Sequence, residues 1–214
     1  MSSNLKLYTY TGTRRVIDQT QKYYVGILMV EGWKNPDKWP YYAIDNGAYS
    51  AYVNKKEWDP IPFLRTINRA RNYDRKPDFV VCPDIVAGGS DSLTHSVNWL
   101  RVLPRELPYY LAVQDGMELP EVADVIRSHG FSGIFVGGTA EWKVKTAESW
   151  CILAKELGVR CHIGRIGPGK KILWAERIGA DSVDSTTWVQ REKAWDHVKY
   201  ARNQQNLDDT EVVS

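Results

Sequence analysis

The chain has 214 residues, of which 43% are hydrophobic and 25% charged, and its formal net charge is +2. These values exclude a disordered chain and favour one globular domain. The near-neutral charge excludes a protein that coats long stretches of duplex, although a local basic face remains allowed. Three cysteines without CxxC spacing exclude a disulfide framework and a structural zinc site.

Eight short apolar runs, each ending in polar or glycine residues, organise the chain. They are rich in Val, Ile and Tyr, which at this length is typical of buried parallel strands. In chain order they cover residues 5–11, 23–29, 42–46, 78–84, 109–115, 133–138, 160–165 and 180–185. We therefore predict eight strands.

Amphipathic stretches of helical period lie between the runs. Each carries a stripe of apolar residues, and Gly158 and Gly179 follow two of them as stop signals. Alternation of strands with helices indicates a parallel α/β fold. The predicted stripes are Ile61, Leu64 and Ile67; Val122, Val125 and Ile126; Val144, Ala147, Cys151, Ala154 and Leu157; and Ile172, Leu173 and Ile178.

Eight such units favour a compact (β/α)8 barrel, of the kind first seen in triosephosphate isomerase. The first two βα units are compressed, because residues 31–40 contain two prolines and leave little room for a helix. An open doubly wound parallel sheet is the alternative. We expect one catalytic domain over residues 1–202 and a loose polar tail over 203–214.

Four of the predicted strand ends present a carboxylate, namely Asp45, Asp84, Asp115 and Asp184. In both parallel architectures these ends meet at one edge, where chemistry takes place. A single aspartate in such a place is often only a helix N-cap. Four together favour either a Mg²⁺ site or a pair that supplies a nucleophile and an acid/base group for glycosidic chemistry.

Basic residues form two groups. Residues 164–171 nearly match a P-loop, but Lys171 stands where Ser or Thr must bind Mg²⁺, so a nucleotide triphosphatase is disfavoured. Arg165, Lys170 and Lys171 either hold a phosphate after the seventh strand or belong to an ordinary turn. The second group is either a nucleic-acid face or a solvated helix face: Arg65, Arg69, Arg71, Arg75 and Lys76.

Six segments between Ile44 and Trp188 resemble, in the same order, motifs of the tRNA-guanine transglycosylase superfamily. IDNGAY (44–49) resembles its DSGG-aromatic segment, CPD (82–84) its base-recognising aspartate, and AVQDG (112–116) its VQGG strand end. FVGGTAEWK (135–143) resembles its VGGL-A-GE segment, CHIGRIGP (161–168) its HYLMGVG-P, and GADSVDS (179–185) its nucleophile segment.

The resemblance implies a role for each matched residue. Asp184 would be the nucleophile that attacks C1′ of a nucleoside, and Asp45 the general acid/base for the departing and entering bases. Asp84 would bind the guanine edge. The resemblance places the remaining substrate contacts at Gln114, Asp115, Gly137 and Gly138, with Tyr49 and Ile163 on the two faces of the base.

Three departures from the family refine the expected activity. The CxCxxC-and-His zinc site has no counterpart, so we expect no metal and no cofactor. Asp115 stands where bacterial members commonly have Gln, and the chain ends about 30 residues after Asp184. These features resemble the transglycosylases of phages and bacterial modification islands that insert 7-deazaguanines into DNA.

The expected enzyme is a pentosyltransferase that exchanges guanine for a free 7-deazaguanine, such as 7-cyano-7-deazaguanine, in DNA. The alternatives are the same exchange on tRNA, a catalytically silent nucleobase- or nucleic-acid-binding barrel, and a Mg²⁺-dependent hydrolase or lyase. A protein partner or a homodimer would increase the affinity for DNA. Without a signal peptide or a long apolar run, we expect a cytoplasmic protein of a bacterial or phage-infected cell, with no membrane contact.

Exchange in duplex DNA requires the target guanine to leave the stack. The chain has nine Trp and twelve Tyr residues, an ample supply of aromatic surface for filling the gap or stacking on neighbouring bases. The alternative for any single one is packing on the barrel exterior. The tryptophans that we considered for this contact are Trp33, Trp39, Trp142 and Trp188.

Overall fold

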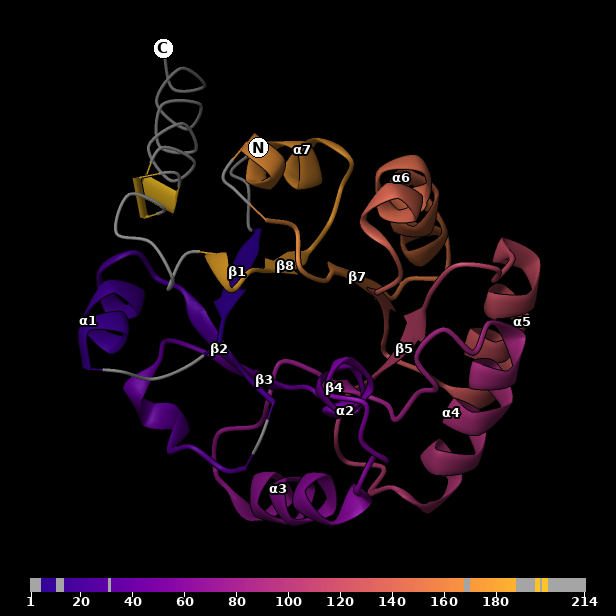
Figure 1. Cartoon of the computed structure of the whole chain (residues 1–214), viewed down its shortest axis with the longest axis horizontal. Helices are drawn as coiled ribbons and strands as arrows, with labels where there is room; N and C mark the ends of the chain where they lie inside the picture. The colour runs from indigo at the N-terminus through magenta and orange to yellow at the C-terminus, as the bar shows by residue number, and fades with distance from the viewer. Residues whose placement is uncertain are drawn as a thin grey trace.

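The chain folds into a closed barrel of eight parallel strands, as seen in a computed structural model (Figure 1). The structure describes residues 5–10, 14–30, 32–167, 170–187, 195–196 and 198–199. The predicted tail over 203–214 therefore lies outside the described residues. The strands are β1 (Lys6–Thr9), β2 (Gly26–Met29), β3 (Tyr42–Ile44), β4 (Val80–Val81), β5 (Tyr109–Val113), β6 (Gly133–Val136), β7 (Arg160–Ile163) and β8 (Ser182–Asp184).

Each strand pairs with its neighbours in sequence, and β1 pairs with β8 to close the ring. In that closing pair Tyr8 lies opposite Asp184, and Leu7 lies opposite Val183. The closed ring confirms the predicted barrel and rules out the open sheet. All eight predicted strands are present at the predicted places.

Side chains alternate between two separate cores, as the period of two in a strand requires. One core fills the barrel interior and contains Tyr8, Phe79 and Tyr110. The other lies between the strands and the surrounding helices and contains Leu7, Val80 and many further aliphatic residues. A residue's parity in its strand therefore decides whether it faces the interior or the helices.

Interior packing depends on one small residue at the entry of β2. A Cβ added to Gly26 would overlap the ring of Tyr41, which lies across the interior and donates its hydroxyl to the carbonyl of Leu7 at 3.0 Å. The Tyr41 ring also packs edge-on against Tyr8 at 5.1 Å between centroids. Glycine is thus required here because a ring from the next strand fills the space of its side chain.

Most helices form an outer ring around the strands (Figure 1). The second βα unit of the barrel is the most compressed, because among the described residues between β2 and β3 the one helix is the short 3-10 helix η1 (Pro36–Lys38).

No helix in the described part of the chain is long and apolar enough to cross a membrane. The α-helices are α1 (Arg14–Lys22), α2 (Ala48–Val53), α3 (Pro60–Asn72), α4 (Ser90–Val102), α5 (Leu119–His129), α6 (Ala140–Glu156) and α7 (Lys170–Arg177).

Two of the predicted apolar stripes are wrong in part. In α3, Ile61 and Leu64 are exposed by 52% and 40%, and the buried stripe instead contains Phe63 and Ala70 beside Ile67. In α6, Val144 is exposed, whereas Trp150 and Leu153 are buried. The predicted helical period is confirmed, but which face of each helix is buried depends on how that helix packs on the barrel.

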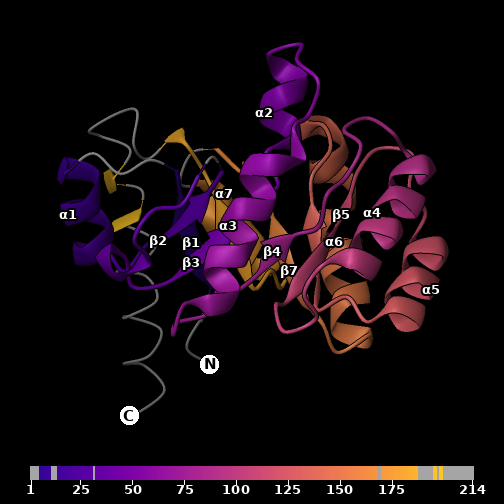
Figure 2. The ribbon, with the colours of Figure 1, turned by 90° about the horizontal axis from the view of Figure 1, so that it is seen from below.

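Helix α2 does not join the ring. It follows β3 directly and projects beyond the end of the barrel at which the strands finish (Figure 2). Its N-cap, Gly47, has a φ of 80°, a left-handed conformation that turns the chain away from β3. The end of the barrel at which the strands finish therefore carries a raised helical turn beside its rim.

Candidate active site

Three of the predicted carboxylates converge at the carboxyl end of the barrel. Asp45 follows β3 directly, Asp84 lies three residues after the end of β4, and Asp184 ends β8. The negative charges of Asp184 and Asp84 both raise the pKa of Asp45, which places the three groups within electrostatic reach of one another. The structure thus brings together three acidic groups from strands that are far apart in the sequence.

Asp184 is fully buried and held through one of its two oxygens. Its Oδ1 accepts hydrogen bonds from Nε2 of His162 at 2.9 Å and from the backbone N–H of Arg165 at 3.1 Å. Its Oδ2 has no hydrogen-bond partner among the described residues. The carboxylate is therefore fixed in orientation by Oδ1, while Oδ2 keeps its lone pairs available for another group.

His162 is a site residue that the sequence did not identify. It lies in the barrel interior with no exposed surface, and its ring stacks on Phe135 at 4.8 Å and 17°. Burial lowers its pKa, so the imidazole is neutral at pH 7. Since Asp184 can only accept, Nε2 carries the proton, and Nδ1 accepts from the hydroxyl of Ser182 at 2.8 Å. The sequence feature that could have identified it is its position in β7, where alternate residues point into the barrel interior.

Asp45 is set up differently from Asp184. Burial raises its pKa to about 7, with the charges of Asp184 and Asp84 acting in the same direction and the N–H of Gly47 acting against them. That N–H donates to Oδ1 of Asp45 at 2.7 Å. Asp45 therefore exchanges a proton near neutral pH, as a general acid/base must.

Asp84 is oriented by a buried asparagine. Nδ2 of Asn46 donates to Oδ1 of Asp84 at 2.7 Å and to the carbonyl of Cys82 at 2.8 Å. Burial raises the pKa of Asp84, and the hydrogen bond from Asn46 acts in the opposite direction. Asn46 follows Asp45 directly, so the same strand end supplies a proton-exchanging group and the residue that aims Asp84.

Tyr10 adds a hydroxyl to the same region. It is half-buried just after β1, and its pKa is raised well above 10 by burial first, then by the charges of Asp184 and Asp45 and by hydrogen bonding to Asp184. The phenol therefore stays protonated and can donate a hydrogen bond near both carboxylates. Its place in the sequence does not mark it as a site residue, because aromatic residues are common at the ends of strands that have no functional role.

Asp115 is used within the protein. Its Oδ2 accepts from the backbone N–H of Thr139 and its Oδ1 from the Thr139 hydroxyl, both at 2.8 Å. Partial burial raises the pKa of Asp115, but the hydrogen bonds from Thr139 outweigh it and lower the value. A Cβ on Gly138, which has a φ of 68°, would lie 2.6 Å from Oδ2 of Asp115. Asp115 and Gly138 thus join the loops after β5 and β6.

The side chain of Gln114 is also occupied. Its Oε1 accepts from the N–H of Ala87 at 2.6 Å, and its Nε2 donates to the carbonyl of Ile85 at 2.8 Å. The backbone N–H of Gly137 donates to the carbonyl of Val113 at 2.8 Å. In this conformation Gln114 and the Gly137 amide therefore support the rim, and neither presents a free group to a ligand.

The expected contact of Ile163 with a base requires a correction. Ile163 is fully buried in the core between the strands and the helices. Its neighbours in β7 and the following turn, His162 and Gly164, lie on the interior side, so Ile163 faces the opposite way. The position of Ile163 in the motif could not show on which side of the strand its side chain lies.

Arg165 connects three loops at the rim. Its guanidinium carbon lies 3.6 Å from the ring centroid of Tyr49 in α2, and its NH2 donates to the carbonyl of Gly138 at 3.3 Å. Tyr49 is 43% exposed, so one side of this stacked pair faces solvent. Arg165 and Tyr49, both predicted site residues, therefore lie in direct contact with each other.

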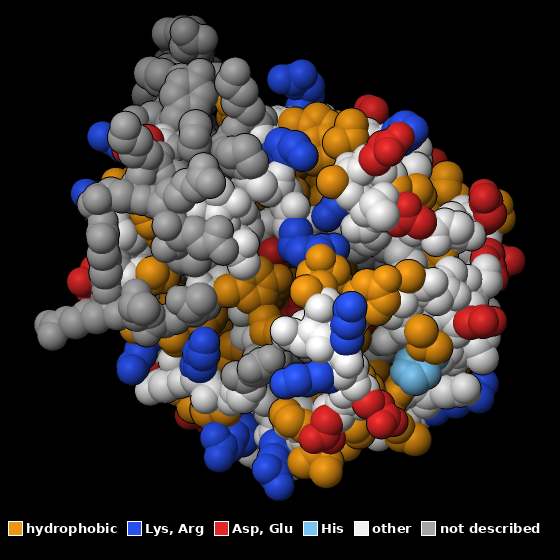
Figure 3. Space-filling model, in the orientation of Figure 1, with side chains coloured by type: hydrophobic (Ala, Val, Ile, Leu, Met, Phe, Trp, Pro, Cys, Tyr) orange, Lys and Arg blue, Asp and Glu red, His pale blue; other side chains and the backbone are white. Residues whose placement is uncertain are grey.

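Lys143 is a buried cation beside this loop. It comes from α6 and donates to the carbonyl of Gly164. Burial lowers its pKa to about 8, and the charge of Arg165 acts in the same direction. Lys171 also contributes to that shift and is half-buried, whereas the side chain of Lys170 lies outside the described residues. Lysine and arginine side chains gather near the centre of this face (Figure 3).

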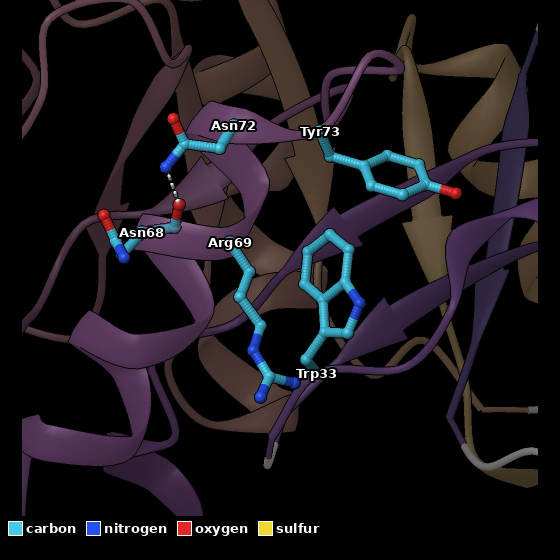
Figure 4. A pocket seen from close by; sticks show the side chains of 5 residues that line it. All are labelled: Trp33, Asn68, Arg69, Asn72 and Tyr73. Carbon is cyan, nitrogen blue, oxygen red and sulfur yellow. Dashed lines mark hydrogen bonds between the residues drawn. The ribbon is translucent and has the colours of Figure 1, made fainter.

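The two cavities that we characterised lie away from the carboxylates. One, of about 580 Å³, opens at the opposite end of the barrel between Lys6, Asp78 and Arg160. The other, of about 350 Å³, lies on the barrel flank between Trp33 and α3 (Figure 4). Because Asp184 has no exposed surface, a substrate reaches its Oδ2 only after the covering residues move.

Much of the basic group on α3 and in the segment just after it makes contacts within the protein. Arg71 pairs with Glu106 at 2.9 Å, Arg75 donates to the carbonyl of Trp39 at 2.8 Å, and Lys76 donates to two backbone carbonyls. Arg69 lines the flank cavity beside Trp33 (Figure 4). The group is therefore largely a set of helix-end contacts.

The tryptophans considered for base stacking do not lie free at the rim. Trp39 is buried, and Trp33 and Trp142 are half-buried against the outer core. Trp188 lies outside the described residues. The exposed aromatic residues near the carboxylates are instead tyrosines of α2, Tyr49 and Tyr52.

Within the described ranges, no group of three or more His, Cys, Asp or Glu side chains has the geometry to hold a metal ion. Comparison of the sequence with models of protein families and with curated proteins found no match. The roles of the site residues therefore rest on the geometry of the site.

Proposed function

We propose that this protein exchanges guanine for a 7-deazaguanine in DNA, with Asp184 as nucleophile and Asp45 as general acid/base. The observation that carries the proposal is the contrast between these two neighbouring carboxylates. Asp184 is anchored through Oδ1, and its Oδ2 accepts no hydrogen bond of normal geometry from the described residues, whereas the pKa of Asp45 is raised to about 7. Paired carboxylates with separated roles are the requirement for displacement at a sugar carbon.

In the first displacement, Oδ2 of Asp184 attacks C1′ of the target nucleoside and the bond from C1′ to the base nitrogen breaks. Asp45 gives its proton to the departing guanine, which leaves as the neutral base. In the second, Asp45 takes the N–H proton of the entering 7-deazaguanine, whose nitrogen attacks C1′ and releases Asp184. Two displacements retain the configuration at C1′.

Recognition of the base is assigned to Asp84. An ionised carboxylate accepts from both the ring N–H and the exocyclic amine of guanine. The hydrogen bond from Asn46 favours that ionised form and fixes the carboxylate against the interior. The stacked pair of Tyr49 and Arg165 lies at the same rim, where a planar base or a backbone phosphate would meet it.

Trapping of a covalent adduct tests the proposal. The protein is incubated with duplex DNA or with tRNA and labelled 7-cyano-7-deazaguanine, and both incorporated label and denaturation-resistant adducts are measured. We expect incorporation into DNA by the wild type, and loss of adduct and exchange in Asp184→Asn. Asp124→Asn, on an exposed residue of α5, is the matched control and should behave as wild type.

Four results would contradict the proposal. Full exchange by Asp184→Asn would remove the assigned nucleophile. Incorporation into tRNA alone would keep the chemistry and change the substrate. Tight binding of the base without exchange on either nucleic acid would make the barrel a binding module, and activity abolished by a chelator would indicate a metal-dependent reaction instead.

A further inference from the structure

The raised turn of α2 has a surface that the proposed chemistry does not use. Tyr52 and Val53, at the end of the helix, are each 55% exposed. Lys55 and Lys56 follow them and are also exposed. We call residues 52–56 the α2 tip. The tip thus places two exposed apolar side chains beside two exposed lysines at the end of the projection.

The tip is held firmly at its base. The carboxamide oxygen of Asn46 accepts from the N–H of Ala48 at 2.7 Å, and the indole N–H of Trp58 donates to the carbonyl of Asn46 at 2.8 Å. The first residue of α2 and Trp58 after the helix are thus both tied to Asn46, which also orients Asp84. The tip is therefore fixed relative to the catalytic carboxylates.

The turn itself is closed by local hydrogen bonds. The side chain of Asn54 donates to the carbonyl of Ser50 at 2.8 Å, and the backbone N–H of Lys56 donates to the carbonyl of Ala51 at 2.9 Å. Lys55 has a φ of 53°, which reverses the chain sharply after Val53. This produces a narrow projection with Tyr52 and Val53 at its end.

We propose that the α2 tip is a wedge that enters a DNA duplex beside the target guanine and holds open the stack from which the base has left. The inference rests on the proposed function. A paired base must be turned out before Asp184 can reach C1′, and apolar wedges that separate base steps are a recurrent solution. The exposed lysines beside Tyr52 and Val53 match the phosphates that flank such a gap.

The position of the tip favours this partner over others. Helix α2 begins three residues after Asp45 and projects from the catalytic end of the barrel (Figure 2). A protein partner of ordinary stability needs roughly 800 Å² on each side, whereas the tip is a single turn. An unpaired guanine in an RNA loop would need no wedge, whereas a paired guanine in duplex DNA would.

Comparison of duplex with single-stranded DNA tests the wedge. One DNA fragment is offered either intact or as separated strands, and exchange by Tyr52→Ala and Val53→Ala is measured on both. We expect a loss of about tenfold or more on the duplex, because the unstacked state loses its support. On single strands, where no stack must be opened, both variants should stay within about twofold of wild type.

Two further variants serve as controls. Tyr52→Phe keeps the ring and should retain duplex activity, whereas Val102→Ala alters a residue that is 74% exposed at the end of α4, away from the rim. Thermal unfolding verifies that all variants are folded. Undiminished duplex activity in both alanine variants would overturn the wedge, as would an equal loss on both substrates. Absence of exchange by the wild type on either substrate would overturn the proposed function and the wedge with it.

Discussion

Replacement of Asp45 by Asn should stabilise the protein, and the gain should depend on pH. Asp45 has an ordinary pKa of 3.8 in an unfolded chain, and burial raises it to about 7 in the folded protein. Between these values the folded state keeps a proton that the unfolded state has lost. The free energy of unfolding therefore falls as the pH rises through this window and remains lower above it.

The size of the effect follows from the shift. A rise from 3.8 to about 7 corresponds to about 4 kcal/mol, which is an upper limit because the side chain is only partly buried. Asn keeps the acceptor for the N–H of Gly47 and cannot ionise. At pH 8 we expect Asp45→Asn to be more stable than wild type by about 2–4 kcal/mol, a rise in Tm of about 5–15 °C.

Urea or thermal unfolding at several pH values between 4 and 8 measures the difference between the two proteins. The variants should be nearly equal at pH 4, where Asp45 is largely protonated in the wild type. Exposed Asp124→Asn should show no such trend. A difference between Asp45→Asn and wild type that does not grow with pH would refute the reasoning, since Asp45 would then be ionised at pH 7 and unable to act as the acid.

Two further substitutions test the surroundings of the site. His162→Phe keeps an aromatic ring beside Phe135 but removes the hydrogen bonds to Ser182 and Asp184; unfolding in urea should show a loss of about 2–4 kcal/mol, more than Ser182→Ala. An unchanged stability would mean that Asp184 does not depend on this contact. Asp115→Asn weakens the acceptor for Thr139 and should cost about 0.5–1.5 kcal/mol in the same assay. Its preference between guanine and 7-deazaguanine should match wild type; an altered preference would show that Asp115 binds the base.

The order and number of the strands could be predicted from the sequence because a buried parallel strand is a local pattern. Eight apolar runs ending in polar residues are confirmed as β1–β8, and in the described residues of the proline-rich segment between β2 and β3 the one helix is the short η1. The carboxylates at four of these ends were predicted to meet, since parallel strands all finish at one rim, and three of them, Asp45, Asp84 and Asp184, lie within electrostatic reach of one another.

What each side chain does at that rim was decided by contacts between distant segments. The resemblance led us to expect that Gln114 and Asp115 contact the substrate. In the structure their side chains instead form hydrogen bonds with Ala87, Ile85 and Thr139 of neighbouring loops. Ile163 faces the helices rather than the rim. Hydrogen-bond partners across loops, and the parity of a strand relative to the interior, are not encoded in the local pattern.

The pair Asp45 and Asp184 shows both sides of this division. Their places at strand ends follow from the sequence, because hydrophobic runs fix where a strand begins and ends. Their unequal environments come from the tertiary structure: burial raises the pKa of Asp45 to about 7, whereas His162 and Arg165 hydrogen-bond to Oδ1 of Asp184 and hold that carboxylate in place. Burial and partner geometry exist only once the barrel has closed, so they are properties of the fold.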